Sequence, residues 1–343
     1  MPYLRLIGQR LLITLLTLWG LATLVFFMVK LIPGDEAQVA AGPGASQDQV
    51  AIVAHRLGLD VPIYEQYLRF IGRLLQGDLG TSILSSQPVL ADLAAVLPST
   101  IELMIFAAAI GLLIAVPAAL WAAGRRDGPV DGSTRVGAIL AGGLPTFWLA
   151  LMLQYLLGTV WRIAPISGQN SFGMAAPVVT GIPTVDALIA GNLPAFSDAL
   201  GHLILPAIVF AVPFAAQVFR VLRATLIGVL ASDMVPPVRA KGASAWRILL
   251  RHALPNSMVP AINLVGTLFG GMMAGAILVE TVFARRGVGT YLANAVAQKD
   301  TFAVLGTVVF VGASVCIVNL VADLAVLLVD PRLRSTALGA AAR

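Results

Sequence analysis

Six long runs without a charged residue constrain this sequence more than any other feature. A helix needs about 20 apolar residues to cross the roughly 30 Å hydrocarbon core of a bilayer. Only helices and closed barrels satisfy their backbone hydrogen bonds in lipid. The runs therefore predict an all-α integral membrane protein with about six transmembrane helices. They are Leu11–Val29, Leu103–Gly124, Val136–Trp161, Leu203–Phe219, Met258–Val279 and Thr301–Ala322.

The composition agrees with a chain that lies mostly in lipid. Of its 343 residues, 58% are hydrophobic and only 11% are charged, which is too few charges for the surface of a soluble domain. The single cysteine, Cys316, excludes an internal disulfide framework and a cysteine-based metal site. The three histidines are scattered along the chain, so we expect neither a catalytic nor a metal site.

The charges that remain are distributed unevenly between the two sides of the predicted bundle. Most of the 22 Lys and Arg lie in segments 1–10, 124–136, 220–257 and 330–343, which share one side if there are six spans. The positive-inside rule places that side, with both termini, in the cytoplasm. The positive net charge therefore reflects topology, and we expect no nucleic-acid partner.

Two segments between the spans have a distinctive pattern. The first outer segment predicts a helix from about Gln47, with Ser46 and Gln49 in capping-box spacing. It also predicts a short amphipathic helix over Ile63–Leu75. The uncharged run Ile163–Val185 is broken by several prolines and glycines, so it is interpreted as an outer loop rather than a span.

Small residues mark one face of the fifth predicted span. Gly266, Gly270 and Ala274 recur every four residues, and Gly271 pairs with Gly275 at the same spacing. Such spacing lets the backbones of two membrane helices approach closely. It predicts a tightly packed face, either within the chain or against a second membrane subunit.

Two acidic residues lie close to predicted spans. Ser99 and Glu102 have the spacing of a capping box, so Glu102 is interpreted as part of a helix start. Asp323 directly follows the last run and is interpreted as the one acid well inside a span, where an ionisable residue is a functional candidate. Structural pairing of Asp323 is the favoured interpretation, and its role stays open.

The longest inner segment connects the fourth and fifth runs. Pro237 suits the first position of a helix and pushes Pro236 to an extended conformation. Gly242 suits the position after a helix end. The segment therefore predicts a helix of one to two turns over 237–241, and a second helix over 244–253 that stops before Pro255.

This inner segment resembles the Glu-Ala-Ala loop of binding-protein-dependent ABC importer permeases. That pattern is Glu-Ala-Ala, three residues, Gly, nine residues, Ile, one residue, Leu-Pro. Gly242, Leu254 and Pro255 match it at the right spacing, whereas Pro236-Pro237-Val238 replaces Glu-Ala-Ala and His252 replaces Ile.

Further blocks resemble the dipeptide, oligopeptide and nickel branch of this family, specifically the first of its two permease subunits. The similarity extends over nearly the whole chain, and its strength lies in the order and spacing of the blocks. They are Leu31-Ile32-Pro33-Gly34-Asp35, Gly77-Asp78-Leu79-Gly80-Thr81-Ser82, Leu144-Pro145-Thr146-Phe147-Trp148, Glu280-Thr281-Val282-Phe283 and Asp330-Pro331-Arg332.

The resemblance implies a transport subunit of the bacterial cytoplasmic membrane rather than an enzyme. It implies a second homologous permease, two ABC ATPase subunits that bind ATP and Mg²⁺, and an external solute-binding protein. This chain itself has no Gly-x-x-x-x-Gly-Lys-Ser/Thr phosphate loop and needs no cofactor. By the same resemblance, the residues that couple to an ATPase are Arg239, Ala240, Lys241, Gly242, Leu254 and Pro255.

The expected organisation has three parts. Residues 1–98 form an anchor helix and an outer amphipathic segment, and residues 331–343 form a cytoplasmic tail. Residues 99–330 form a permease core whose coupling loop spans about 224–257.

Di- or oligopeptides are the expected solutes, while nickel chelates, glutathione and oligosaccharides remain alternatives within the same class. A secondary transporter or a membrane enzyme is disfavoured, because the sequence shows neither internal repeats nor a catalytic motif. No span has a polar stripe that would identify the residues lining the path.

Overall fold

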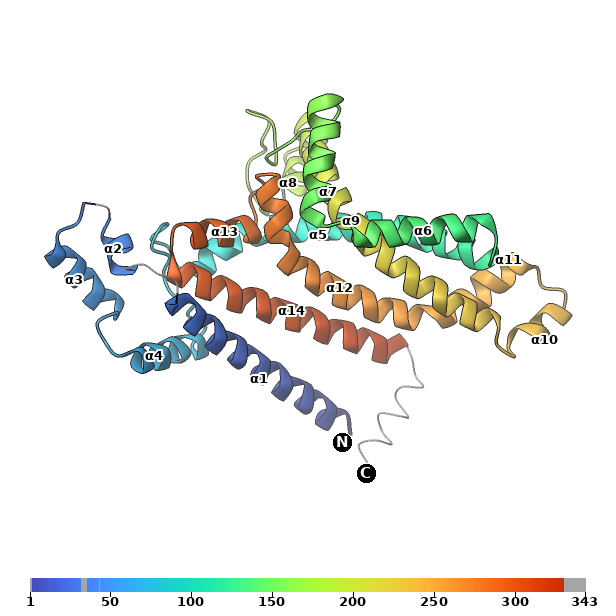
Figure 1. Ribbon diagram of the computed structural model, residues 1–343, viewed down its shortest axis with the longest axis horizontal. Coiled ribbons are helices and arrows are strands. Elements are labelled where there is room, and N and C mark those ends of the chain that lie inside the picture. The colour runs from blue at the N-terminus through green and yellow to red at the C-terminus, as the bar shows by residue number, and fades with distance from the viewer. Residues whose placement is uncertain (1, 32–35, 43, 330–343) are drawn as a thin grey trace.

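A computed structural model describes residues 2–31, 36–42 and 44–329 of the chain, with the side chains of 2–7, 9, 10 and 323–329 outside the description. Over these residues the protein is built from helices, as expected for a membrane chain. The elements are α1 Pro2–Lys30, α2 Glu36–Ala41, α3 Gln47–Leu57, α4 Ile63–Leu75, α5 Val89–Gly124, α6 Pro129–Gly143, α7 Thr146–Leu153, a π-helical turn Gln154–Val160, α8 Pro183–Ile189, α9 Leu193–Leu230, α10 Val235–Ala240, α11 Ala245–Ile248, a π-helical turn Leu249–Ala253, α12 Leu254–Val282, α13 Val288–Ala297 and α14 Thr301–Val329 (Figure 1).

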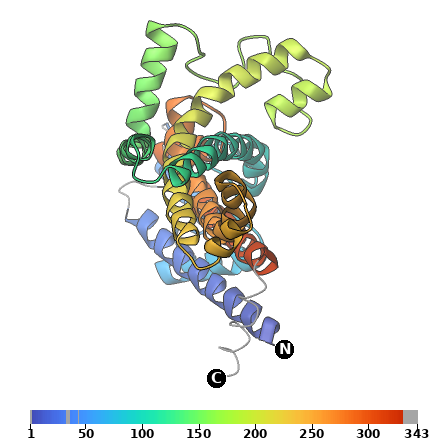
Figure 2. The same cartoon turned by 90° about the vertical axis from the view of Figure 1, so that its right-hand side faces the viewer.

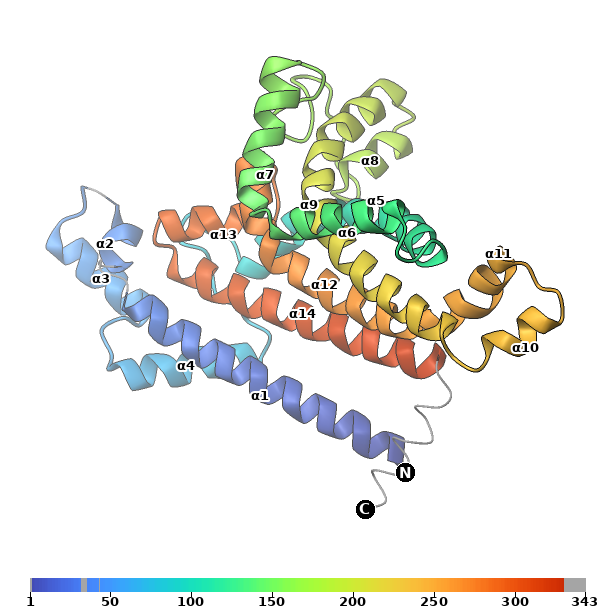
Figure 3. The same cartoon turned by 45° about the vertical axis from the view of Figure 1, so that its right-hand side comes forward.

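Five of the predicted spans appear as helices long and apolar enough to cross a membrane. They are Leu11–Lys30, Val89–Gly124, Leu193–Leu230, Ala245–Val282 and Thr301–Ala322. The start of α1, the end of α14 and the α10–α11 segment lie toward the same end of the bundle (Figures 1 and 3). The assignment of that end to the cytoplasm rests on the charge distribution and stays a prediction.

The third predicted run is not one straight helix, and the protein has six candidate spans only if this bent pair of helices counts as one. The run divides into α6 and the α7 segment, whose axes differ by 99°. Leu144 and Pro145 are extended between them, and Pro145 supplies no N–H that could continue α6. The Leu-Pro-Thr-Phe-Trp block therefore marks a bend, and α7 stands away from the bundle (Figures 2 and 3).

The centre of the molecule is the contact between α5 and α9. Ala107, Ala115 and Ala119 of α5 are buried in the same cluster as Phe210 and Phe214 of α9. A Cβ atom at Gly111 would lie 2.5 Å from the Phe214 ring, so a glycine is required where the two helices cross. Small residues on α5 and large ones on α9 thus allow the backbones to approach closely.

The predicted small-residue face of α12 divides between two neighbours and the surface. A Cβ atom at Gly266 would lie 2.2 Å from Ala322 Cβ of α14, and one at Gly270 would lie 3.3 Å from Val315. A Cβ atom at Gly275 would instead approach Phe210 of α9 at 3.2 Å. Gly271 and Ala274 are exposed, and nothing lies within 4 Å of a Cβ built on Gly271.

The predicted helix start at Ser99 is wrong. Helix α5 begins ten residues earlier, at Val89, and continues through Pro98. Ser99 and Glu102 are buried inside it, so neither residue caps a helix end. The extra turns are stable because other parts of the chain bind the polar side chains there, as described below.

The first outer segment has helices where they were expected. The capping box at the start of α3 is confirmed, since Ser46 Oγ accepts from the Gln49 N–H and Gln49 Oε1 accepts from the Ser46 N–H. Helix α4 spans Ile63–Leu75, and its buried Phe70 stacks on Phe26 of α1. Residues 161–182 form an irregular connection before α8.

We predict opposite effects for two alanine substitutions on α12. Gly266→Ala should lower the free energy of unfolding by about 1–3 kcal/mol, because the new methyl group collides with Ala322. Gly271→Ala should be neutral or should stabilise by up to about 1 kcal/mol, because Ala is the better helix former and has space there. Unfolding of the purified chain in sodium dodecyl sulfate, followed by helicity, measures both. Equal effects at the two positions would contradict the observed α12–α14 packing.

Candidate functional site

The segment between α9 and α12 projects from one end of the bundle (Figure 3). Ser232 begins the turn after α9, where its hydroxyl donates to the Val229 carbonyl at 2.7 Å and its carbonyl accepts from the Val235 N–H at 3.1 Å. Helix α10 then starts at Val235, two residues before the predicted start, so the extended conformation expected for Pro236 was wrong. Both prolines fit the first turn of α10, where backbone N–H groups have no partner within the helix.

Gly242 ends α10 as its sequence position predicts. Its φ of +81° is in the left-handed region, which glycine adopts without strain. Its N–H donates to the Arg239 carbonyl at 2.9 Å, and the Ala243 N–H donates to Val238 at 3.4 Å. Gly242 is exposed, so the substitution of this residue tests backbone conformation and surface chemistry without a packing change.

The second helix of the segment does not stop before Pro255, which corrects the prediction. Ser244 caps α11, and the helix continues through the π-helical turn Leu249–Ala253 into α12, where Pro255 lies in the first turn. The wider π turn changes the hydrogen-bond register just before the residue that cannot donate. Helix α12 is therefore mechanically continuous with α11.

One side of the segment between α9 and α12 is buried against the bundle, and the other side is exposed to solvent. Ile248, Leu249 and Ala253 are buried, and the last two belong to the main apolar core. The predicted coupling residues Arg239, Ala240, Lys241, Gly242 and Pro255 are exposed, and Leu254 is half-buried.

Exposed apolar and basic side chains continue along the same face. Trp246 is 57% exposed, and it lines a pocket of about 530 Å³ together with Trp121 and Arg125 at the end of α5. A rigidly anchored surface that exposes cations and indole rings can bind a protein partner, because aromatic and arginine side chains dominate such contacts.

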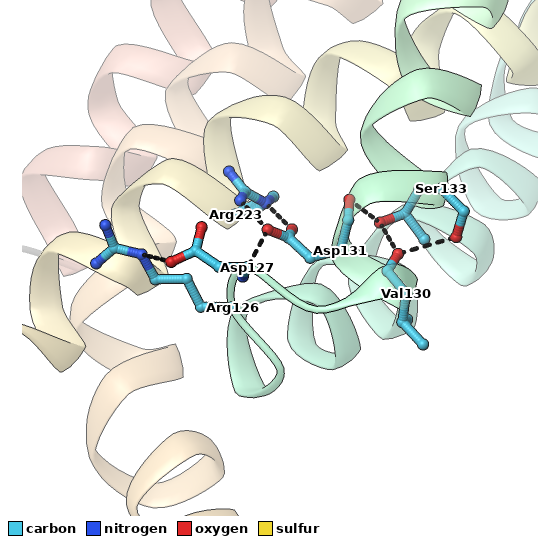
Figure 4. A network of polar contacts seen from close by, with 7 residues as sticks. Arg126, Asp127, Val130, Asp131, Ser133 and Arg223 are labelled. Atoms are coloured by element: carbon cyan, nitrogen blue, oxygen red, sulfur yellow. Dashed lines mark hydrogen bonds and ion pairs between the residues drawn. The ribbon is translucent and has the colours of Figure 1, made fainter.

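A buried ion pair fixes this surface to the rest of the bundle (Figure 4). Arg223, on α9 before the projecting segment, faces Asp131 in the first turn of α6. The Nε atom lies 2.5 Å from Asp131 Oδ1 and Nη2 lies 2.6 Å from Oδ2. This parallel two-bond arrangement is the strongest geometry for an arginine and a carboxylate. The Asp131 side chain is only 1% exposed, so the pair is shielded from water.

The turn between α5 and α6 completes the surroundings of Asp131. The Asp127 N–H donates to Asp131 Oδ2 at 3.2 Å, while the Asp127 carboxylate points outward and lies 3.4 Å from Arg126 Nε. The backbone of Asp127 is left-handed, with φ of 62°. This turn and α9 are therefore held as one unit.

A second polar cluster lies between the first part of α5 and the end of α12, away from the Asp131–Arg223 pair. Glu102 forms an ion pair with Arg285, which is 1% exposed, and it accepts the Thr184 hydroxyl at 2.6 Å. Burial lowers the pKa of the Arg285 guanidinium, and the Glu102 carboxylate opposes that shift. The pair joins α5 to the turn that follows α12 and to α8.

The Glu-Thr-Val-Phe block supplies the centre of the same cluster. Glu280 accepts the Thr100 hydroxyl at 2.6 Å and the Gly289 N–H at 2.7 Å. A Cβ atom at Gly287 would lie 2.2 Å from the Glu280 carboxylate, and one at Gly289 would lie 2.4 Å from the α12 backbone at Ile277. Glycines at these positions let α13 pack against the carboxylate.

The Gly-Asp-Leu-Gly-Thr-Ser block has a structural explanation as well. Gly80 has φ of +90°, and its N–H donates to Asp78 Oδ1 at 2.8 Å. The Ser82 hydroxyl donates to the buried Asp300 at 2.6 Å, and Asp300 also accepts the Ala303 N–H at the start of α14. The block thus ties the first outer segment to α14.

Asp131, Arg223 and Arg285 were not recognised from the sequence as functional residues, and Glu102 was interpreted as part of a helix start. Asp131 and Arg223 are 92 residues apart, and Glu102 and Arg285 are 183 apart, so no local spacing connects them. The sequence offered only a weaker indication of these pairs: each acid lies next to the end of a predicted span, on the same predicted side of the membrane as its arginine. The side chain of Asp323 lies outside the described residues, so its role stays a prediction. In the described part of the chain, no group of three His, Cys, Asp or Glu could hold a metal ion.

Comparison with protein families gives matches along most of the chain. The family described as the inner membrane component of binding-protein-dependent transport systems matches residues 115–335. The N-terminal part of the membrane component of such systems matches residues 3–104.

Individual relatives are similar over almost their entire lengths. The probable D,D-dipeptide transport system permease protein of Escherichia coli K12 is 38% identical, covering 92% of this chain and 93% of the relative. The dipeptide transport system permease protein of the same strain is 37% identical, covering 96% and 99%. The di/tripeptide transport system permease protein of Pseudomonas aeruginosa UCBPP-PA14 is 35% identical, covering 96% and 98%.

The Asp131–Arg223 pair gives a sharp stability prediction. Asp131→Asn should lower the free energy of unfolding by roughly 3 kcal/mol, because it leaves a largely buried guanidinium without its counter-charge. Asp127→Asn is the matched control, since its exposed pair with Arg126 is worth less than about 1 kcal/mol. Denaturant unfolding of the two purified variants measures the difference. A loss no greater in Asp131→Asn than in the control would show that the pair does not hold α6 on α9.

Proposed function

The chain belongs to the family of inner membrane components of binding-protein-dependent transport systems, and from this membership we propose that it forms half of the translocation path of an ABC importer for di- or oligopeptides. The family match covers most of the chain, and the three relatives named above are all peptide permease proteins that match nearly end to end. The protein is a multi-pass permease of the bacterial inner membrane. The near-complete similarity to peptide permeases is the observation that supports the peptide assignment.

Uptake against a gradient requires partners, because this sequence has no phosphate loop that could bind ATP. We propose that two ATPase subunits bind ATP and Mg²⁺ and dock on the α10–α11 surface. A second homologous permease completes the path, and an external solute-binding protein delivers the peptide.

The exposed part of the α12 small-residue face supports the contact with the second permease. Gly266, Gly270 and Gly275 pack against other helices of the same chain, whereas Gly271 and Ala274 remain exposed. Small exposed residues on a membrane helix permit close approach of another helix.

The geometry supports a route for the mechanical step. Closure of the ATPases moves α10, which is joined through Ser232 to α9 and through the anchored α11 to α12. Arg223 and Asp131 carry α6 along with α9, since their two-bond pair is shielded from solvent. The α5–α9 core then transmits the movement toward the cluster of Glu102 and Arg285 at the opposite end.

The importer assignment is tested by identifying the proteins that co-purify with the chain. We expect the tagged chain, purified from its native host in mild detergent, to bring a second permease and ATPase subunits that hydrolyse ATP. After reconstitution with the external binding protein, labelled dipeptide should accumulate in vesicles only with ATP. Transport of solute without ATP by the isolated chain would instead indicate a secondary transporter.

The ATPase contact is tested at Gly242. Gly242→Val should reduce ATP-driven uptake at least tenfold, because a β-branched residue is strained at a φ of +81° and α10 would no longer end there. Gly242→Asn is the matched variant, since Asn tolerates the left-handed region, and it should retain most uptake.

Uptake and the amount of co-purified ATPase are measured for both variants. If Val and Asn behave alike while the chain stays folded, the end of α10 does not determine coupling. In that case the ATPase contact is elsewhere, although the chain could still be a permease.

A further inference from the structure

A pocket of about 480 Å³ lies among the end of α1, helices α3 and α4, and the start of α14. Its volume is in the range of pockets that hold small molecules, roughly 300–1,000 Å³. Helices α3 and α4 lie at the end of the bundle remote from α10 and α11 (Figure 1), so the pocket that they line is separate from the proposed coupling surface. The side chains that matter to its chemistry are Lys30, Glu36, Arg56, Arg69, Arg73 and Phe302.

The pocket has an excess of positive charge. Lys30 Nζ lies 2.8 Å from Glu36 Oε1, and Arg69 Nη2 lies 2.6 Å from Glu65 Oε1, so these two cations are neutralised. Arg56 and Arg73 form no ion pair with an acid among the described residues.

Arg73 is held in place without being neutralised. Its guanidinium carbon lies 5.1 Å from the centroid of the Phe302 ring, a cation–π contact. The contact fixes the guanidinium at the pocket while its charge remains available to an anion. Arginine is also the residue best suited to phosphate, because its planar fork donates two parallel hydrogen bonds.

Glu36 indicates that a ligand of this pocket should also supply a hydrogen-bond donor. The Oε1 atom of Glu36 accepts from Lys30, whereas its Oε2 atom is buried and has no hydrogen-bond partner among the described residues. A buried carboxylate oxygen is costly unless a donor binds it. The pocket therefore fits a ligand that carries both an anionic group and a hydrogen-bond donor.

The position of the pocket coincides with a membrane interface. Lys30 ends the span Leu11–Lys30, and the span Thr301–Ala322 begins beside Phe302, so the pocket lies where two spans leave the hydrocarbon. On the turns of α1 that precede Lys30, the side chains of Leu24, Phe27 and Met28 are 56%, 43% and 58% exposed. In a bilayer this apolar strip faces lipid chains.

We propose that this pocket binds the headgroup of an anionic phospholipid. The phosphate binds Arg56 and Arg73, a headgroup hydroxyl donates to Glu36 Oε2, and the acyl chains lie along the exposed strip of α1. The bound lipid would clamp α3 and α4 against α1 and α14. Free phosphate shares the anionic chemistry but lacks both the hydroxyl donor and the acyl chains. The proposal does not depend on which solute is transported.

The test uses the full-length chain in its native complex, with lipid removed by detergent exchange. Phosphatidylglycerol is titrated in, and bound lipid is counted by native mass spectrometry. We expect the double substitution Arg56→Gln and Arg73→Gln to weaken phosphatidylglycerol binding at least tenfold. The double substitution Arg162→Gln and Arg286→Gln removes the same charge from exposed positions outside the pocket and should leave binding unchanged.

A second measurement on the unsubstituted protein keeps the test independent of folding of the variants. Phosphatidylglycerol should slow amide hydrogen exchange in residues 55–76, and inorganic phosphate at the same concentration should not. Equal lipid binding by both double variants would overturn the proposal. Equal protection by inorganic phosphate would also overturn it, because the pocket would then be a simple anion site.

Discussion

A buried charge or backbone group without a partner is most costly in a bilayer, and the architecture follows from that constraint. The backbone is satisfied inside helices, and the runs that cross the membrane contain almost no ionisable residues. The acids that do become buried are all bound by partners. Asp131 and Glu102 have counter-charges, whereas hydroxyl and backbone N–H groups donate to Asp186, Glu280 and Asp300. Asp131 with Arg223 marks one end of the bundle, and Glu102 with Arg285 marks the other.

Between these two ends the helices are held by close approach rather than by apolar attraction, since lipid is as apolar as the helix surfaces. Alanines of α5 meet phenylalanines of α9, and glycines of α12 meet α14. Interfaces of this kind tolerate little added volume, so the packed helices move as units. A rigid core with polar clusters at both ends suits a protein that must convert a push on one face into a rearrangement on the other.

Much of this could be read from the sequence, and the errors have physical causes. The apolar runs gave the number of spans because hydrophobic length is a local property. Gly242 was placed correctly because a helix end needs a local backbone conformation. Two predicted helix boundaries were wrong. Capping-box spacing placed a helix start at Ser99, although α5 already runs through Pro98, and Pro255 was expected to stop a helix that continues through it. At Pro255 a π-helical turn precedes the proline, and at Pro98 tertiary contacts of Ser99, Thr100 and Glu102 stabilise the extra turns.

The sequence by itself determined that the chain is a helical membrane protein, which segments are long and apolar enough to cross a bilayer, and which motifs resemble an importer permease. These depend on composition and on spacing within one segment. Only the tertiary structure decided which charges pair, that the third run bends by 99°, and which glycines of α12 are buried. Arg285 could not be matched to Glu102 from spacing, because a pairing across 183 residues depends on how several helices pack. That packing is a property of the whole fold, since each contact exists only when the other helices hold both partners in place.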